Sequence, residues 1–343
     1  MEAIRYYKRY IVENKNLVLI TIIIALIFRG CVYLIHTDPL TYSYTPGYLW
    51  STAIDNFLVE HRNISALIAI LFTAIIAFYS GYLNNKHKLI RSRTYLVYVF
   101  CILFFSSHPV YIYMSPQYVS TLLLIISTDI LLGSFQRTDS SGKAYSIGFL
   151  IASASLFTPS ALIYIPVFWI GFRVMRCFKI KAIVTSLLGI ISVYWIIFFY
   201  YLWQQDLNSF LEPLEQLYPI FSNYIKDISI ASIIILAFCL ILLMIAMVSY
   251  FNNSYKDKIQ TRANLYFFYM IALFSLLSFL FINNTPTLYL YIFAFSCSLL
   301  FSHFFSLILE KWKVSFFYLS ITLYLIISIY FLFSSTIIDL LTV

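Results

Sequence analysis

The sequence has little charge for its length. Asp, Glu, Lys and Arg together make up 10% of its 343 residues, whereas hydrophobic residues make up 62%. Soluble domains carry roughly 25% charged residues, so this composition excludes an ordinary water-exposed surface. We therefore expect most of the surface to contact membrane lipids.

The chain also lacks the clustered cysteines of a zinc site or a disulfide framework. Its five cysteines stand singly within or beside apolar segments, and no Cys-x-x-Cys or Cys/His pairing occurs. They are Cys31, Cys101, Cys177, Cys239 and Cys297. Single cysteines of this kind are typical of small apolar side chains packed between helices.

Nucleic acid is not an expected partner, although the net charge is +8. Nineteen of the 22 Lys and Arg lie in short segments between apolar spans, which is the pattern of loops that stay on the cytoplasmic side of a membrane. Four basic residues precede the first apolar span, and no cleavage site follows it. We therefore expect an uncleaved first helix with a cytoplasmic N-terminus.

Nine segments are long and apolar enough to cross the hydrocarbon core, which requires about 20 residues. They cover residues 17–35, 63–83, 94–113, 117–135, 182–203, 228–250, 264–282, 288–308 and 314–335. The pattern predicts an all-α fold, that of a polytopic helical membrane protein with about nine full spans. Since no internal repeat, low-complexity segment or soluble domain is visible, residues 1–343 form a single transmembrane domain in this interpretation.

Residues 144–172 differ from the other apolar segments because Thr158-Pro159 interrupts them. Proline removes a helical hydrogen bond and clashes with the preceding turn, so the segment forms either one kinked span or two short helices. A single span would move every later basic segment to the outer side, against the positive-inside pattern. We therefore predict a short helical hairpin at 144–172 and a C-terminus outside.

Two outer connections, 36–62 and 204–227, are amphipathic. In the first, apolar residues recur at helical spacing from Trp50 to Leu58. In the second, a similar stripe runs from Leu207 to Phe221. Helices of this kind lie in the membrane interface, so we expect both connections to rest against the bilayer.

Three ionisable residues are expected within the membrane, namely Arg29, Asp129 and His303. Such residues are costly in hydrocarbon and usually face the protein interior or a wet cavity. Arg29 would extend to the outer headgroups, pair with an internal carboxylate, or hold a phosphate or carboxylate of a ligand. Asp129 would be a structural partner, which is favoured, or a proton or ion site. His303 is expected to be an interhelical hydrogen-bond donor.

Asp38 and Asp55 are the candidate catalytic residues of the first outer connection. Asp38 follows the span that carries Arg29, and helical rise separates the two by at most about 14 Å. A carboxylate at this height can take a proton from an acceptor hydroxyl or bind a divalent metal. The candidate substrate-binding residues are Arg29, His36, Glu60, Arg62 and Asp206.

The layout of residues 1–200 resembles that of the GT-C class of membrane glycosyltransferases. The shared features are an acidic residue early in a long first outer loop, an interfacial helix, a returning span and short broken helices. The resemblance implies sugar transfer from polyprenyl-phosphate donors, with Asp38 as the catalytic or metal-binding acid and Arg29 at the lipid-linked phosphate. Asp38 stands alone where that class usually has paired acids. The chain also resembles polytopic membrane proteins of Bacteroidota, which would place it in a bacterial inner membrane.

The sequence leaves three functions open. The first is a GT-C-like glycosyltransferase that acts on lipid-linked sugars of the cell envelope. The second is an accessory subunit of an envelope assembly or secretion complex, with other membrane proteins as partners and no catalysis. The third is a transporter or lipid flippase in which Arg29 and Asp129 line a pathway. Membrane lipids are expected partners in all three.

Overall fold

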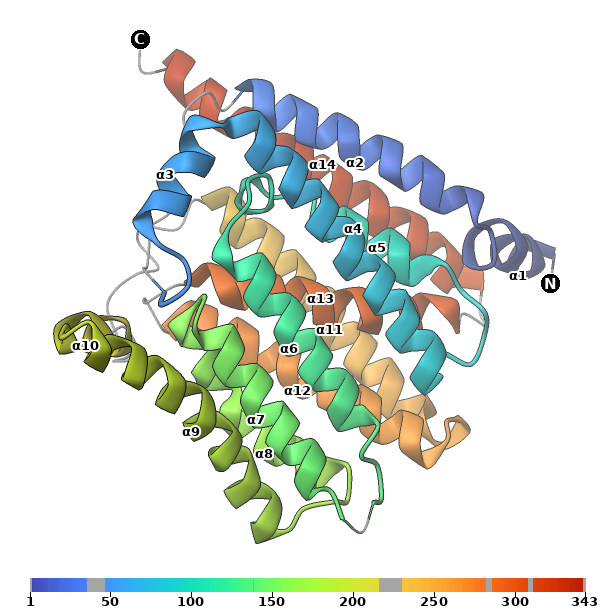
Figure 1. Cartoon of the computed structure of the whole chain (residues 1–343). Helices are drawn as coiled ribbons and strands as arrows, with labels where there is room; N and C mark the ends of the chain where they lie inside the picture. Colours follow the sequence, from blue (N-terminus) through green and yellow to red (C-terminus); the bar gives the residue numbers. More distant parts are fainter. Residues whose placement is uncertain are drawn as a thin grey trace.

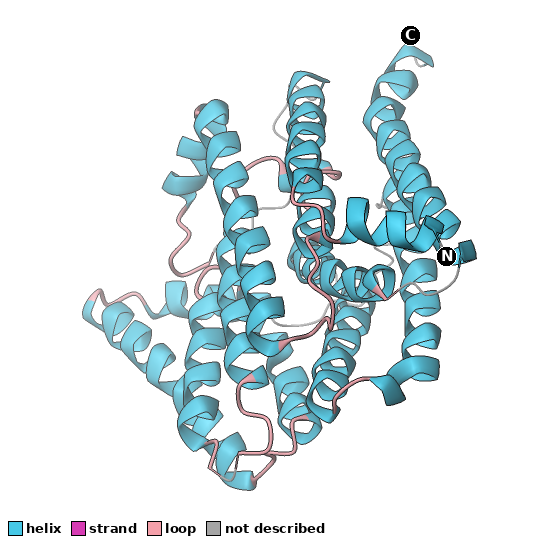
Figure 2. Ribbon diagram, turned by 90° about the vertical axis from the view of Figure 1, so that its right-hand side faces the viewer, coloured by secondary structure: helices cyan, strands magenta, loops and turns pink. Residues whose placement is uncertain are grey.

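The structure is a computed structural model that describes residues 2–35, 47–137, 139–215, 230–281, 286–307 and 311–341. Within these ranges every regular element is helical (Figure 2), as the apolar spans predicted. The α-helices are α1 (Glu2–Tyr7), α2 (Asn16–Ile35), α3 (Thr52–Glu60), α4 (Arg62–His87), α5 (Leu96–Phe104), α6 (Pro116–Leu132), α7 (Ser141–Ser155), α8 (Ile165–Val174), α9 (Ile180–Trp203), α10 (Leu207–Glu215), α11 (Ile230–Asn253), α12 (Ile259–Phe281), α13 (Pro286–Ser306) and α14 (Lys311–Leu341). Shorter helical turns are η1 (Lys8–Val12), η2 (Pro109–Tyr111), η3 (Pro159–Tyr164) and η5 (Ser254–Lys256).

Seven described helices are long and apolar enough to cross a membrane, judged by length and composition. They are α2, α4, α9, α11, α12, α13 and α14. Their outward faces are apolar, with Leu19, Phe78 and Ile196 each more than 60% exposed. Water penalises such a surface and lipid favours it, so the fold fits a multi-pass membrane protein.

Two of the nine expected spans, 94–113 and 117–135, contain shorter helices than the sequence suggested. α5 ends at Phe104, and α6 has 17 residues. Pro109 and Pro116 each open a helix, and the residue before each one is extended, because proline disfavours helical geometry in its predecessor. The number of membrane crossings therefore stays a prediction.

The segment at 144–172 forms a hairpin rather than one kinked span. α7 ends at Ser155, and η3 begins at Pro159, which is the break that the proline predicted. The two ends of the hairpin meet, since the backbone N–H of Gln136 donates to the carbonyl of Met175 at 2.9 Å. The basic residues on either side of the hairpin consequently lie at the same end of the molecule.

The basic connecting segments gather at one end of the bundle, which we call the basic end. It contains the connections around residues 88–95, 133–143, 173–181 and 254–262, together with the N-terminal segment. The contacts include a hydrogen bond from the Thr261 hydroxyl to the Lys88 carbonyl at 3.3 Å. α3 and α10 lie at the opposite end, on the left of Figure 1. This separation matches the positive-inside pattern, and which end faces the cytoplasm stays a prediction.

α13 is the central helix of the core. Its membrane-length segment, Thr287–Ser306, is buried along its whole length. It packs against α12, α5, α11 and α6, whereas α2, α9 and α14 lie at the periphery with most of their surface exposed. The C-terminal part of α13 lies at the basic end, where His303 contacts Asp257. Its N-terminal part lies near Arg29, since Tyr291 packs on Tyr118.

Glycines allow α7 and α9 to approach each other closely. A Cβ atom at Gly148 would lie 2.0 Å from the carbonyl oxygen of Ser186, and one at Gly189 would lie 2.3 Å from that of Tyr145. Small residues at such crossings let two membrane helices pack backbone against backbone. This contact holds α9 against the hairpin.

Candidate functional site

Arg29 lies inside the protein because it falls on the inward face of α2. The buried residues of this helix are Thr21, Ala25, Arg29 and Val32, whose spacing of three or four forms one stripe. Arg29 is 4% exposed. The Arg29 side chain therefore does not extend to the lipid headgroups, which was one of the three roles that the sequence left open.

The guanidinium of Arg29 is surrounded by neutral acceptors. Its Nη2 donates to Thr73 Oγ1 at 2.6 Å, to the Phe105 carbonyl at 2.8 Å and to Tyr118 Oη at 3.4 Å. Its Nε donates to Ser106 Oγ at 3.3 Å. The remaining nitrogen, Nη1, is buried without a hydrogen-bond partner. No carboxylate in the described ranges forms an ion pair with Arg29.

Two of the hydroxyl groups that contact Arg29 are themselves held in place. Thr73 donates its hydrogen to the Ala69 carbonyl at 2.8 Å, and Tyr118 donates to the Tyr111 carbonyl at 2.5 Å. Each oxygen is thereby left as an acceptor for Arg29. Because a guanidinium stays protonated in proteins, these contacts pair its Nε and Nη2 groups without neutralising its charge.

The space beside this guanidinium is small in the present conformation. A cavity of about 10 Å³ borders Ser106, with Ala25, Phe28 and Ser328 in its wall. This is about the volume that one water molecule needs. Beyond Arg29, α2 continues to Ile35. The next residues of the chain include His36 and Asp38, which lie outside the described residues.

The other acidic candidates have local partners. Asp55 lies in the first turn of α3 and accepts a hydrogen bond from Trp50 Nε1 at 3.4 Å. Glu60 is exposed in the last turn of the same helix. No hydrogen bond or ion pair between described residues joins either carboxylate to Arg29. Arg29 and Asp55 thus make no direct contact, and the catalytic roles expected for Asp38 and Asp55 stay predictions.

Asp206 caps the start of α10. Its carboxylate accepts from the Ser209 hydroxyl at 2.5 Å and from the Ser209 backbone N–H at 3.2 Å. These hydrogen bonds lower the pKa of Asp206. The residue is fully exposed on the surface, and a helix cap explains its position.

Arg62, at the start of α4, is held by tyrosines. Its Nη2 donates to Tyr113 Oη at 2.7 Å, and its guanidinium lies over the rings of Tyr33 and Tyr113 at 5.3 and 5.6 Å. Tyr33 is on α2, one turn beyond Arg29. Arg62 therefore links α2 to α4 close to Arg29 along the chain of α2.

Asp129 lies in a network at the basic end of α6. Its Oδ2 is 2.7 Å from Lys86 Nζ and 3.1 Å from Tyr79 Oη, and its Oδ1 is 2.6 Å from His87 Nε2. All three partners are on α4. Such a set of contacts connects α4 to α6 and agrees with the structural role favoured for Asp129.

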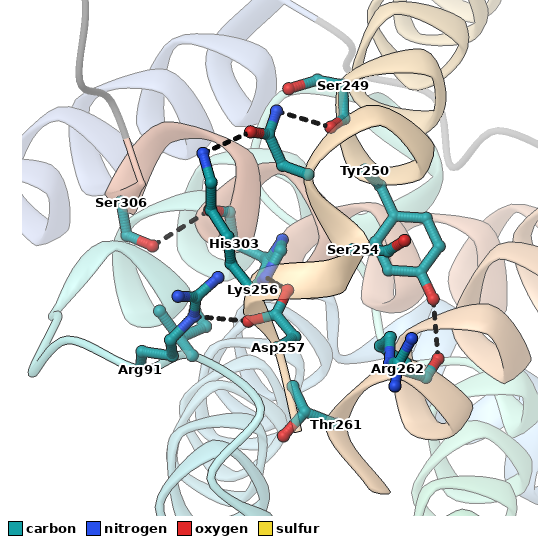
Figure 3. Close-up of polar contacts among 12 residues, drawn as sticks. Arg91, Ser249, Tyr250, Ser254, Lys256, Asp257, Thr261, Arg262, His303 and Ser306 are labelled. Atoms are coloured by element: carbon teal, nitrogen blue, oxygen red, sulfur yellow. Dashed lines mark hydrogen bonds and ion pairs between the residues drawn. The ribbon is translucent and has the colours of Figure 1, made fainter. Parts of the chain in front are cut away.

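A second buried carboxylate, Asp257, was not singled out by sequence reasoning. Its side chain is 2% exposed; Oδ1 is 2.5 Å from Arg91 Nε, and Oδ2 is 3.6 Å from His303 Nε2 (Figure 3). Burial acts to raise the pKa of Asp257, but the contacts with His303 and Arg91 outweigh it and hold this pKa below its usual value. The available signal was an isolated acid between Lys256 and Lys258.

Metal ligands are sparse in the part of the chain that the structure describes. It contains no group of three or more His, Cys, Asp or Glu that could hold a metal ion. All five cysteines are free; four are buried, as expected for packed apolar side chains, whereas Cys31 is exposed. A divalent metal at Asp38 stays a prediction, because Asp38 is outside the described residues.

Comparisons with family models, with curated proteins and with solved structures give no match to this chain.

Proposed function

We propose that the protein binds the phosphate of a lipid-linked sugar at Arg29 and transfers the sugar, as a GT-C-like glycosyltransferase of the cell envelope. One observation carries the proposal. Arg29 is a buried guanidinium with neutral acceptors, an unpartnered Nη1 and no carboxylate partner among the described residues.

An uncompensated charge inside a protein is unfavourable unless a counter-ion or a ligand balances it. A phosphate monoanion or dianion is such a ligand, and its oxygens match the planar donors of a guanidinium. A phosphate attached to a polyprenyl chain would also keep its apolar part in the bilayer. We therefore expect Arg29 to bind a lipid-linked anion in preference to a soluble one.

In the proposed reaction, Asp38 accepts the proton of an acceptor hydroxyl, directly or with the help of a bound divalent metal. The acceptor oxygen then forms a bond to the anomeric carbon of the sugar. The bond between that carbon and the phosphate oxygen breaks, and the polyprenyl phosphate leaves with the electron pair. Arg29 stabilises the negative charge that develops on this leaving group.

Two interfacial helices support access for the lipid. α3 exposes Ile54 and Phe57, which are 41% and 49% accessible, and α10 exposes Leu207 and Leu211. An apolar face of this kind rests in the headgroup region. The apolar face of α3 would accommodate the lipid chain next to the end of α2.

The test uses Arg29→Gln and Arg29→Lys, with Arg173→Gln, a change of an exposed arginine at the basic end, as the control. Purified variants are reconstituted with a labelled polyprenyl-phosphate sugar, and both donor binding and sugar transfer are measured. Loss of a charge-assisted contact should weaken donor binding by roughly 10- to 100-fold in Arg29→Gln. Arg29→Lys keeps the charge without the planar fork and should fall between Gln and wild type. Unchanged donor binding in a folded Arg29→Gln variant would refute the proposal.

A second candidate, transport or lipid flipping, is favoured by one feature. α4 and α6 contact Arg29 toward one end and share the Asp129 network at the other. The same vesicles can be assayed for substrate or lipid movement, which should depend on Asp129 if this alternative holds. If neither activity is present and a membrane protein co-purifies stably, the accessory-subunit alternative is favoured instead.

A further inference from the structure

A pocket at the basic end lies between the end of α8, the end of α11 and the start of α12. Its volume is about 320 Å³, which is within the usual range for small-ligand sites. The lining residues are Val174, Arg176, Tyr250, Ile259, Arg262, Ala263 and Tyr266. Two arginines facing one pocket point to an anionic ligand.

Neither arginine is neutralised within the described part of the chain. Arg176 and Arg262 form no ion pair there, and Arg262 Nε is buried without a hydrogen-bond partner. The nearby carboxylate of Asp257 is already engaged by Arg91 and His303 (Figure 3). The Tyr250 hydroxyl donates to the Arg262 carbonyl at 2.8 Å (Figure 3), which fixes the backbone that carries this arginine.

The backbone of Arg176 is also unusual. Its φ angle of 56° is left-handed, at the position after α8 where helices usually have glycine. The N–H of Arg176 donates to the Arg173 carbonyl, and the N–H of Cys177 donates to the Phe172 carbonyl, as in a Schellman motif. A side chain at this position strains the backbone, and local strain is typical of residues with a function.

The start of α12 adds to the positive potential of the pocket. Ile259, its first residue, lines the pocket, and the first N–H groups of a helix have no partner within the helix. Such an N-terminus attracts anions. It would reinforce the two guanidinium groups.

We propose that this pocket binds the phosphate of an anionic phospholipid headgroup, with Arg176 and Arg262 as its donors. The apolar part of the lining favours a lipid over free phosphate. Ile259 and Tyr266 are 51% and 39% exposed on α12, one of the membrane-length helices, so acyl chains can follow this helix into the bilayer. Basic pockets between membrane helices bind anionic headgroups in this manner. The site uses none of the residues of the proposed transferase site.

The test is native mass spectrometry of the purified protein with phosphatidylglycerol, phosphatidylcholine or inorganic phosphate. The variants are Arg176→Gln and Arg262→Gln. Arg173→Gln is the matched control, because Arg173 is an exposed arginine three residues before Arg176 and does not line the pocket. Each pocket variant should bind phosphatidylglycerol about tenfold more weakly. The control should bind it like wild type, and phosphatidylcholine should bind weakly to all of them.

Equal weakening in Arg173→Gln would indicate general attraction of basic residues to anionic lipid and would overturn the proposal. Equal binding of the two phospholipids by wild type would overturn it as well. If inorganic phosphate displaces phosphatidylglycerol at millimolar concentration and its binding also requires both arginines, the pocket takes free phosphate and the lipid assignment is wrong. Melting temperatures of the lipid-free variants report whether each one is folded. Arg29→Gln should leave phosphatidylglycerol binding unchanged, so the two proposals fail independently.

Discussion

Replacement of Asp257 by asparagine should destabilise the basic end of the protein. Asp257 connects three elements, since Arg91 lies between α4 and α5, His303 lies on α13, and Asp257 itself precedes α12. Asparagine has nearly the same shape but no charge. The substitution therefore removes the ion pair with Arg91 and the negative charge that faces His303, while preserving the packing.

The expected magnitude follows from the exposure of the partners. Breaking a fully buried ion pair destabilises a protein by about 3–5 kcal/mol, whereas a fully exposed pair contributes about 0–1 kcal/mol. The Arg91 side chain is 42% exposed and can be solvated when the carboxylate is lost, but His303 is only 7% exposed. The amide oxygen of the introduced asparagine would still accept one hydrogen bond. We expect a loss of about 2 kcal/mol in the free energy of unfolding.

The same residue predicts a pH dependence. The pKa of Asp257 is lower in the folded protein than its usual value, which in an unfolded chain is about 3.9. A lowered folded-state pKa stabilises the protein fully above the unfolded pKa, and this stabilisation is lost as the pH falls through the folded pKa. The difference in stability between wild type and Asp257→Asn should therefore be constant near pH 7 and shrink below about pH 4.

Reversible unfolding in mixed detergent micelles, followed by tryptophan fluorescence, measures both effects. Asp139→Asn is the control, because Asp139 is an exposed carboxylate in another basic segment whose hydrogen bonds are to Ser141. A double-mutant cycle with Arg91→Gln isolates the pairwise term. If Asp257→Asn is as stable as wild type at pH 7, desolvation cancels the ion pairs and the reasoning is refuted.

Two further predictions concern the backbone. Gly148→Ala should lower the free energy of unfolding by roughly 1–3 kcal/mol, because its Cβ would meet the Ser186 carbonyl. Gly142→Ala is the control on the same helix, since a Cβ there has open space and should not destabilise the protein. Equal unfolding curves for the two variants would contradict the close packing of α7 and α9. Arg176→Gly should raise the free energy of unfolding by about 1 kcal/mol in the absence of lipid, because glycine adopts the left-handed conformation without strain. A lower melting temperature of lipid-free Arg176→Gly would mean that the arginine is structural.

Local sequence features predicted much of the fold. Hydrophobic runs of about 20 residues predicted nine spans, and seven described helices are of membrane length, because a helix satisfies its own backbone hydrogen bonds in lipid. Thr158-Pro159 predicted the break in the hairpin, and the amphipathic pattern after Trp50 predicted α3. The helices at 94–113 and 117–135 are shorter than the hydrophobic runs suggested, because α5 ends at Phe104 and α6 ends at Leu132, before Gly133.

The sequence also identified Arg29, Asp129 and His303, because ionisable residues inside an apolar segment are conspicuous without a structure. It could not identify their partners. Ser106 lies 77 residues from Arg29, and Lys86 lies 43 residues from Asp129. Contacts at such separations depend on how the helices pack, which no local pattern specifies.

What the sequence by itself determined is a helical protein whose surface suits a membrane and whose basic segments belong together, since these properties depend on composition and spacing. Only the tertiary structure decided that Arg29 points inward without a described counter-ion, that Asp257 joins Arg91 to His303, and that Arg176 and Arg262 share a pocket. The physical reason is that the sequence states which side chains carry a charge, whereas the packing of the helices decides which groups lie close enough to balance that charge.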